Sequence, residues 1–292
     1  MTLPNLQEYF LPDTTAEALA LMQRFGDGAM VVAGGTFVHG LEVRGLLEEV
    51  VALIDIQRLG LNAISRQSDG TAVLGATATL AALDHSDFVR TEAAFGAVRD
   101  ALACPPQQIR NIGTIGGCVA AAAPLYDLPA ALLVLEGGVR TVGSRGMREL
   151  PLAGFFRGLF ENALDPGELI TAVTVPAPAP RSASAFLKLE TNANDLAIIS
   201  VAVRLTLGAG NACVNPRIIL GGGVGETYVH AVQAEAALAG QPARAASFAA
   251  AAAAVAADID PVSDHRASAE YRRHIAGVYV GRALTTALER LD

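Results

Sequence analysis

Three glycines within five residues, at positions 113, 116 and 117, limit what this chain can fold into more than any other feature. They lie in segment 109–118, which follows two prolines and precedes an alanine run. Glycine has no Cβ and tolerates positive φ, so this segment predicts a loop whose backbone approaches another group closely. We expect that group to be a phosphate or an aromatic cofactor, because successive glycine N–H groups form an anion site and Thr114 adds a hydroxyl donor.

A second apolar run also ends in paired glycines. Residues 30–33 are Met, Val, Val and Ala, and Gly34, Gly35 and Thr36 follow them. A diphosphate held between the two segments could accept hydrogen bonds from the backbone N–H groups of both. For either segment alone, the alternative is a tight turn in which glycine serves only the backbone geometry.

Hydrophobic periodicity predicts a βαβ unit around the first glycine pair. Its expected elements are a helix over 14–25, a strand over 30–33, a helix over 37–47 and a strand over 50–56. Asp55 lies about 20 residues after the glycines, where a Rossmann nicotinamide site places its ribose-binding carboxylate. The Gly-x-Gly-x-x-Gly pattern is absent, so a Rossmann-type NAD-binding protein remains only an alternative.

The rest of the chain predicts two further regions separated by a linker. Before the linker we expect a strand over 72–75, helices over 76–82 and 88–103, an apolar hairpin of 130–135 with 139–142, a loop or sheet edge over 145–150 and a strand over 169–175. Residues 176–180 read Pro-Ala-Pro-Ala-Pro and predict an extended linker. After it we expect antiparallel strands over 185–189, 198–207 and 217–220 and helices over 234–238, 244–257 and 269–291.

Composition narrows the function class. The hydrophobic fraction of 52% is ample for a buried core in 292 residues. A net charge of −8 without a long basic run argues against nucleic acid as a partner. The first ten residues do not resemble a signal peptide, and no window has the roughly 20 apolar residues of a membrane span. We therefore expect a cytoplasmic protein with no membrane span.

Cysteine and histidine usage argues against a metal site on this chain. The 3 cysteines, Cys104, Cys118 and Cys213, cannot supply the four thiolates of a typical iron–sulfur cluster. The 5 histidines show no zinc-site spacing. We expect no metal ligands and no catalytic residues on this chain. Any iron–sulfur cluster would then lie on another chain.

Taken together, four motifs resemble the FAD-binding (medium) subunits of molybdenum hydroxylases, the family that includes the flavoprotein subunit of carbon monoxide dehydrogenase and the FAD domain of xanthine dehydrogenase. The motifs are Ala-Gly-Gly-Thr at 33–36, Ile-Arg-Asn-Ile-Gly-Thr-Ile-Gly-Gly at 109–117, Asp-Leu-Pro at 127–129 and Ser-Asp-His-Arg-Ala-Ser-Ala-Glu-Tyr-Arg at 263–272. The resemblance covers almost the whole chain.

The resemblance implies an α+β fold, in which a two-lobed FAD-binding domain of the vanillyl-alcohol-oxidase/PCMH type precedes a smaller sheet-and-helix C-terminal domain. The implied boundaries are 1–176 for the FAD domain, with lobes of roughly 1–57 and 58–176, and 177–292 for the C-terminal domain. It also implies partners: an iron–sulfur small subunit, a molybdopterin large subunit and a small-molecule electron acceptor, in a heterohexamer of two heterotrimers.

The resemblance further implies a set of cofactor-binding residues. They are Val31, Val32, Ala33, Gly34, Gly35, Thr36, Phe37, Val38, Thr114, Ile115, Gly116, Gly117, Cys118, Asp127, Ile170 and Lys188. The sequence departs from the family pattern at Cys118, at Tyr126 and at residues 194–196, where Asn-Asp-Leu replaces the usual glycine, aspartate and aromatic residue. We expect Asp264 and Arg266 to form a structural pair away from both glycine segments.

The function that follows is electron transfer: FAD on this chain takes electrons from a partner's iron–sulfur cluster and passes them to an external acceptor. Because the cofactor supplies the chemistry, no catalytic triad is needed. The alternatives are a stand-alone FAD oxidoreductase of the same fold and a scaffold subunit without a flavin.

Overall fold

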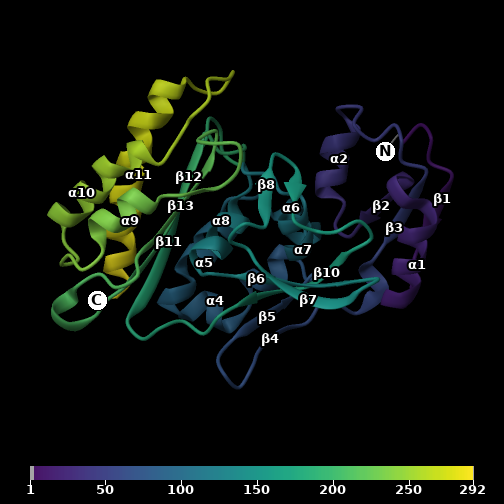
Figure 1. Cartoon of the computed structure of the whole chain (residues 1–292), viewed down its shortest axis with the longest axis horizontal. Coiled ribbons are helices and arrows are strands. Elements are labelled where there is room, and N and C mark those ends of the chain that lie inside the picture. The colour runs from purple at the N-terminus through teal and green to yellow at the C-terminus, as the bar shows by residue number, and fades with distance from the viewer. Residues whose placement is uncertain (1–2, 292) are drawn as a thin grey trace.

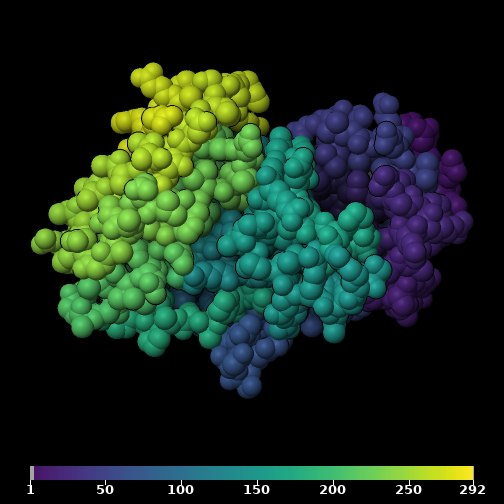
Figure 2. Space-filling view, viewed as in Figure 1, coloured from purple at the N-terminus to yellow at the C-terminus, as the bar shows by residue number. Residues whose placement is uncertain are grey.

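The computed structural model describes residues 3–291, and the expected domain ends at residues 1 and 292 lie outside them. The N-terminal, central and C-terminal parts of the chain follow one another across the molecule, each built on its own β-sheet (Figure 1). The space-filling view shows the three parts in contact, from purple through teal to yellow (Figure 2). Among the described residues, no helix combines the length and apolar composition needed to cross a membrane.

The N-terminal part contains the predicted βαβ unit. Strand β3 (Ala52–Asp55) lies between β1 (Glu8–Phe10) and β2 (Ala29–Val32), and both pairings are parallel. Helix α1 (Thr15–Phe25) begins where the Thr14 hydroxyl accepts a hydrogen bond from the Glu17 N–H. Helix α2 (Thr36–Glu42) starts at the predicted place but ends earlier than residue 47. Strand β1 has no clear signal in the sequence, because its 3 residues are too few to show a periodicity.

The central part is a five-stranded antiparallel sheet, in the order β4-β5-β10-β6-β7. Its strands are β4 (Ile64–Arg66), β5 (Ala72–Gly75), β10 (Leu169–Val175), β6 (Gly138–Gly143) and β7 (Gly146–Pro151). A short hairpin of β8 (Phe156–Gly158) and β9 (Glu161–Asn162) lies beside it. The predicted edge over 145–150 is therefore a real edge strand, and it is the partner of β6.

The prediction of residues 130–135 as the first strand of that hairpin is wrong. These residues belong to helix α8 (Asp127–Val134), in which every residue except Leu133 is buried. A short run that is apolar on all sides has the same pattern in a buried strand and in a buried helix. The helix start was nevertheless marked, because Asp127 and Pro129 occupy its first turn, where an acidic residue and proline are both favoured.

The central glycine segment is helical, which corrects the prediction of a loop. Its two short helices are α6 (Gln107–Ile112) and α7 (Ile115–Ala120), separated by Gly113 and Thr114. The predicted single helix over 88–103 is also broken, at Glu92. The helices preceding the glycine segment are α3 (Leu80–Asp84), α4 (Asp87–Thr91) and α5 (Gly96–Ala103).

The C-terminal part confirms the predicted change to antiparallel strands followed by helices. Its sheet has the order β11 (Ser182–Leu189), β12 (Ile199–Thr206), β13 (Arg217–Gly222) and β14 (Val229–His230). Its helices are α9 (Val232–Leu238), α10 (Ala245–Ala254) and α11 (Ala269–Glu289). Helix α11 packs on β11 and β12 from one side, while α5 and α8 pack on the sheet from the other.

Alternation along β11 divides the interior into two cores. Phe186 packs into the central core with α5 and α8 residues, whereas Ala185 packs into the C-terminal core with α10 and α11 residues. Successive side chains of a strand point to opposite faces, so the next residue on the Phe186 face is Lys188. This places a lysine at the boundary between the central helices and the C-terminal sheet.

Candidate FAD-binding site

The first glycine pair connects β2 to α2 and touches the second glycine segment. Gly35 has φ +69°, a left-handed conformation that L side chains rarely adopt. Gly34 lies so close to α6 that a Cβ on it would be 1.9 Å from the Ile112 carbonyl oxygen. The two glycine segments are thus in direct contact, and Gly34 is required for that contact.

The second glycine segment packs tightly against the central sheet. A Cβ on Gly116 would lie 2.8 Å from the Ala76 carbonyl oxygen, so this glycine makes room for protein backbone. The Thr114 hydroxyl accepts a hydrogen bond from the Gly117 N–H at 3.2 Å and so caps α7. Thr114 therefore fixes the start of the helix instead of pointing freely into a cavity.

Two pockets meet at these segments. One, of about 170 Å³, is bordered by both glycine segments, and the other, of about 210 Å³, runs from the same place towards β11. They share Thr36, Cys118 and Tyr126, so they are adjacent parts of one candidate site. Of the predicted residues, the site is lined by Val31, Val32, Ala33, Gly34, Gly35, Thr36, Phe37, Val38, Thr114, Gly117, Cys118, Asp127 and Lys188.

A buried ion pair forms the far end of the site. The Lys188 ammonium lies 3.2 Å from Oδ2 of Asp127 and 3.1 Å from Oε2 of Glu190. The side chains of Lys188 and Asp127 are only 5% and 8% exposed. Lys188 comes from β11 and Asp127 from the first turn of α8, so the pair joins the central helices to the C-terminal sheet.

Burial and pairing act in opposite directions on the two charges. Burial raises the pKa of Asp127 to about 6, although the neighbouring Lys188 ammonium opposes this shift. For Lys188 burial works against the charged form, but the carboxylates of Asp127 and Glu190 outweigh it and raise the pKa of the amine. Lys188 is therefore a cation at neutral pH, and the Asp127 carboxyl changes its protonation state near pH 6.

Lys188 is also the only lysine in the sequence, since every other residue of the 21 basic ones is an arginine. Lysine carries a compact ammonium on a flexible stem, whereas arginine presents a planar fork. Lys188 therefore places a compact positive charge at the end of this pocket, which an arginine would not do.

One oxygen of the ion pair has no partner. Asp127 Oδ1 is buried without a hydrogen bond in the described part of the chain. A buried unsatisfied acceptor costs roughly 1–3 kcal/mol, and more when charged, so Oδ1 is a place where a water or a ligand can supply a donor. Oε2 of Glu190, 3.1 Å from the ammonium, also lacks a hydrogen bond in the described part of the chain. A ligand that fills the pocket and offers a hydroxyl or amide donor at Asp127 Oδ1 fits the site.

The aromatic and thiol side chains of the site are neutral. Burial is the main cause that raises the pKa of both Cys118 and Tyr126 to about 12. The Tyr126 ring packs edge to face on Phe37, with ring centroids 6.1 Å apart. Cys118 is therefore a protonated thiol, and neither side chain brings charge to the site.

Several predicted residues lie outside these pockets. Ile115 is fully buried in the central core, and Gly116 packs on Ala76. Ile170 lies in β10 opposite Thr141 and is 4% exposed. These three residues line neither pocket, so the structure does not bring them to the ligand surface described above.

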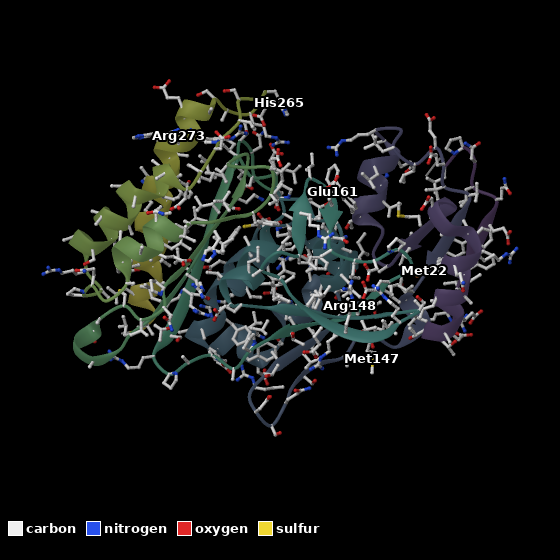
Figure 3. All side chains as sticks on the ribbon, in the orientation of Figure 1. Met22, Met147, Arg148, Glu161, His265 and Arg273 are labelled. Carbon is white, nitrogen blue, oxygen red and sulfur yellow. The ribbon has the colours of Figure 1, made fainter. Side chains whose placement is uncertain are left out.

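Asp264 and Arg266 do pair, but through the backbone, because the Arg266 N–H donates to Oδ1 of Asp264 at 2.8 Å. Asp264 also binds the buried Arg272 guanidinium with both oxygens, at 2.8 and 2.9 Å. The Arg266 guanidinium donates to Oδ1 of Asp195 at 2.9 Å, and Asp195 lines the pocket beside Leu196. Figure 3 labels His265, the neighbour of Arg266, near the start of the C-terminal helix. Arg266 is therefore close to the site, which sequence separation concealed.

The pocket is completed by apolar residues, of which only Ile109 and Gly113 belong to the predicted glycine segment. They are Leu80, Ala101, Leu102, Pro105, Pro106, Ile109, Gly113, Leu125 and Leu128. Pro105 and Pro106 were visible only as a helix stop. A wall of this kind has no sequence signal, because core and pocket residues of these types follow the same pattern.

Known proteins resemble this chain over nearly its whole length. The family described as the FAD binding domain in molybdopterin dehydrogenase matches residues 4–178, and the CO dehydrogenase flavoprotein C-terminal domain matches residues 184–287. The carbon monoxide dehydrogenase medium chain of Afipia carboxidovorans is 33% identical over 290 residues, which are 99% of each chain. Subunit alpha of the 6-hydroxypseudooxynicotine dehydrogenase complex of Paenarthrobacter nicotinovorans is 34% identical over 98% of this chain and 96% of its own.

Solved structures extend the similarity to three dimensions. A structure of carbon monoxide dehydrogenase from Hydrogenophaga pseudoflava, lacking the Mo-pyranopterin moiety of its cofactor, matches with a TM-score of 0.92 and 33% identity over 99% of both chains. Quinoline 2-oxidoreductase from Pseudomonas putida 86 matches with a TM-score of 0.90 and 26% identity over 100% of both. This α+β chain therefore belongs to the FAD-binding flavoprotein family of the molybdopterin dehydrogenases, and its cofactor is FAD.

Proposed function

We propose that this chain is the electron-transfer subunit of a molybdenum-containing dehydrogenase complex. In this proposal it receives electrons from an iron–sulfur cluster on a small partner subunit and passes them to a small-molecule acceptor. The observation that carries the FAD site is the unpartnered Asp127 Oδ1 at the end of a pocket that begins at two touching glycine segments. Bound FAD supplies the conversion between one-electron and two-electron transfer.

We propose that the predicted residues hold the cofactor in two groups. Residues 31–38 with Thr114, Gly117 and Cys118 border the diphosphate and ribityl chain, where backbone N–H groups can donate to phosphate oxygens, and Ile115 and Gly116 support this segment from the core side. Asp127 accepts from the cofactor through Oδ1, and Lys188 contributes a buried positive charge beside the flavin. Ile170 remains in this proposal as a residue that supports the site from β10.

The partners proposed for this chain follow from its relatives. Two of these relatives are named as the medium chain of carbon monoxide dehydrogenase and as a subunit of a dehydrogenase complex. We propose an iron–sulfur small subunit and a molybdopterin large subunit as partners, in a heterohexamer of two heterotrimers. Substrate oxidation then takes place on the large subunit, and we also propose a cytoplasmic location.

We further propose that the chain folds as two domains, 1–176 and 177–292, with the first divided into lobes of roughly 1–57 and 58–176. The separate sheets on either side of residues 176–180 support this division, although Phe186, Ala202 and Ile219 of the second domain pack into the central core. The site lies at the junction, since Lys188 belongs to the second domain and Asp127 to the first.

The experiment is purification of the chain from its own cells through an affinity tag, followed by subunit and metal analysis. The proposal expects two further subunits, with iron and molybdenum in the purified assembly. Recovery of the tagged chain alone, with stoichiometric flavin and full oxidation of its physiological substrate, would establish the stand-alone FAD oxidoreductase instead.

A further inference from the structure

Strand β11 is hydrogen-bonded to α5 at Ser184 and at Phe186, the two alternate positions that precede Lys188. Ser184 accepts a hydrogen bond from the Ala97 N–H at 2.8 Å and donates to the Ala94 carbonyl at 2.6 Å. Two residues further on, the Phe186 N–H donates to Oδ2 of Asp100 at 3.0 Å. Lys188 follows on the same face, because strand side chains repeat every second residue.

An arginine from the end of α11 completes this junction. Arg290 donates to Oδ1 and Oδ2 of Asp100 at 2.7 and 2.8 Å, a bidentate pair. The same guanidinium donates to the Ser184 carbonyl oxygen at 2.6 Å. The fit is tight, since a Cβ on Gly96 would lie 2.3 Å from that oxygen and 2.4 Å from Nη1 of Arg290.

The hydrogen bonds of Ser184, Asp100 and Arg290 hold β11 against α5, which strand pairing within the sheet does not do. Pairing with β12 along residues 182–189 fixes β11 within its sheet, but it does not fix the sheet against the central helices. The Asp127 carboxylate belongs to α8, which packs on α5, while the Lys188 ammonium moves with β11. A bond between α5 and β11 therefore acts together with the packing of α8 on the sheet to set the distance across the ion pair.

Asp100 does not line the pocket itself, but its neighbours in the helix do. Asp100 directly precedes Ala101 and Leu102 on α5, and both of these residues line the pocket with Lys188. A displacement of Asp100 thus shifts the apolar wall and the charged end of the pocket together.

We propose that Arg290 and Asp100 are positioning residues: their bidentate pair locks β11 against α5 and so holds the Lys188 ammonium between Asp127 and Glu190. The C-terminal helix thereby contributes to the flavin site without touching it. The effect on FAD affinity rests on the function proposed above, whereas the placement of Lys188 does not.

The single lysine makes a direct test possible. The full-length chain is treated with an amine-acetylating reagent, with FAD bound and after its removal, and acetylation of the peptide that contains Lys188 is followed by mass spectrometry. The variants are Arg290→Met and Asp100→Asn, with Arg290→Lys as the conservative replacement. Peptide mapping separates residue 290 from residue 188.

Arg273→Met is the matched control. Arg273 also lies on α11 and donates to backbone carbonyls, those of Ala256 and Ile259, at 3.1 and 3.4 Å. It lies near the start of α11, as labelled in Figure 3, whereas Arg290 caps the end of the same helix. Loss of Arg273 should lower thermal stability without changing the reactivity of Lys188.

In Arg290→Met we expect Lys188 to be acetylated about tenfold faster, the factor that corresponds to ~1.4 kcal/mol of lost protection. FAD should bind about tenfold more weakly, and Arg290→Lys should give an intermediate rate because lysine cannot make the bidentate pair. If Arg290→Met does not fold, the acetylation rate and the FAD affinity of Asp100→Asn are compared with those of the wild type instead.

A rate equal to that of the wild type in both Arg290→Met and Asp100→Asn would overturn the inference, as would an equal acceleration in Arg273→Met. Faster acetylation with unchanged FAD affinity would support the positioning of Lys188 and would separately contradict its proposed contact with the flavin.

Discussion

The unpartnered oxygen of Asp127 gives the sharpest prediction. Oδ2 is held by Lys188 at 3.2 Å, whereas Oδ1 is buried without a hydrogen-bond partner among residues 3–291. A donor on FAD that meets Oδ1 forms a hydrogen bond to a charged group, which contributes about 1.5–3 kcal/mol. Asp127→Ala removes this bond, so FAD should bind about 10- to 150-fold more weakly, at ~1.4 kcal/mol for each factor of ten.

Asp127→Asn separates the charge from the shape of the side chain. The amide keeps one acceptor oxygen but only a neutral one, so we expect a loss of about tenfold, smaller than for alanine. Lys188 retains Glu190 at 3.1 Å, and the variant should fold. Affinity is measured by flavin fluorescence titration of the FAD-free chain.

The pH dependence tests the same atom independently. The pKa of Asp127 is raised to about 6 in the FAD-free chain, mainly by burial. A donor from FAD favours the carboxylate, so binding lowers this pKa and releases a proton at pH below about 6. Affinity should therefore rise as the pH increases towards 6 and level off above it, and Asp127→Asn should remove this rise.

Asp258→Asn is the control, because Asp258 accepts from the Gln233 and Ala234 N–H groups at the start of α9, away from the pocket. It should lower stability but leave FAD affinity unchanged. Equal affinities for wild type and Asp127→Ala, or an unchanged pH profile in Asp127→Asn, would refute the assignment of Oδ1 to the cofactor.

Three further predictions concern the glycines and the lysine. Gly35→Val should weaken FAD binding, since valine at φ +69° costs about 1–2 kcal/mol or more and distorts the loop, as seen by the same titration. Gly34→Ala should instead lower the urea midpoint of the FAD-free chain, because its Cβ meets the Ile112 carbonyl oxygen at 1.9 Å; an unchanged midpoint would contradict the packing. Lys188→Met should lower the free energy of urea unfolding more at neutral pH than at pH below about 6, because Asp127 loses its counter-ion. A carboxyl with a pKa of about 6 can be protonated at pH 7 for about 1.4 kcal/mol, which bounds this part of the loss; equal losses at both pH values would contradict the pairing.

Local sequence patterns were sufficient to predict the strands whose hydrophobic residues follow a regular pattern. The alternation in β10 and β12 and the apolar runs of β2 and β3 identified those strands. They failed for residues 130–135, where every side chain is apolar and a period cannot be read. They also failed for the second glycine segment, in which glycines lie inside α7 because Gly116 must fit against Ala76.

Sequence patterns revealed the glycine segments of the site but not its charged end. Asp127 and Lys188 are 61 residues apart, and their contact depends on how α8 packs against β11. The pairing of Arg266 with Asp195, across 71 residues, was hidden for the same reason. Tertiary packing that joins distant elements has no periodic trace in the chain, so only the resemblance to a family pointed to Asp127 and Lys188.

The central claim is that this chain carries FAD and obtains its electrons from another subunit. The most direct measurement combines flavin, iron and molybdenum analysis of the purified isolated chain with an assay of physiological substrate oxidation. The account predicts one FAD for each chain, neither metal, no substrate turnover, and turnover restored when the iron–sulfur and molybdenum subunits are added. Full turnover by the isolated chain, or a chain that never binds FAD, would contradict it.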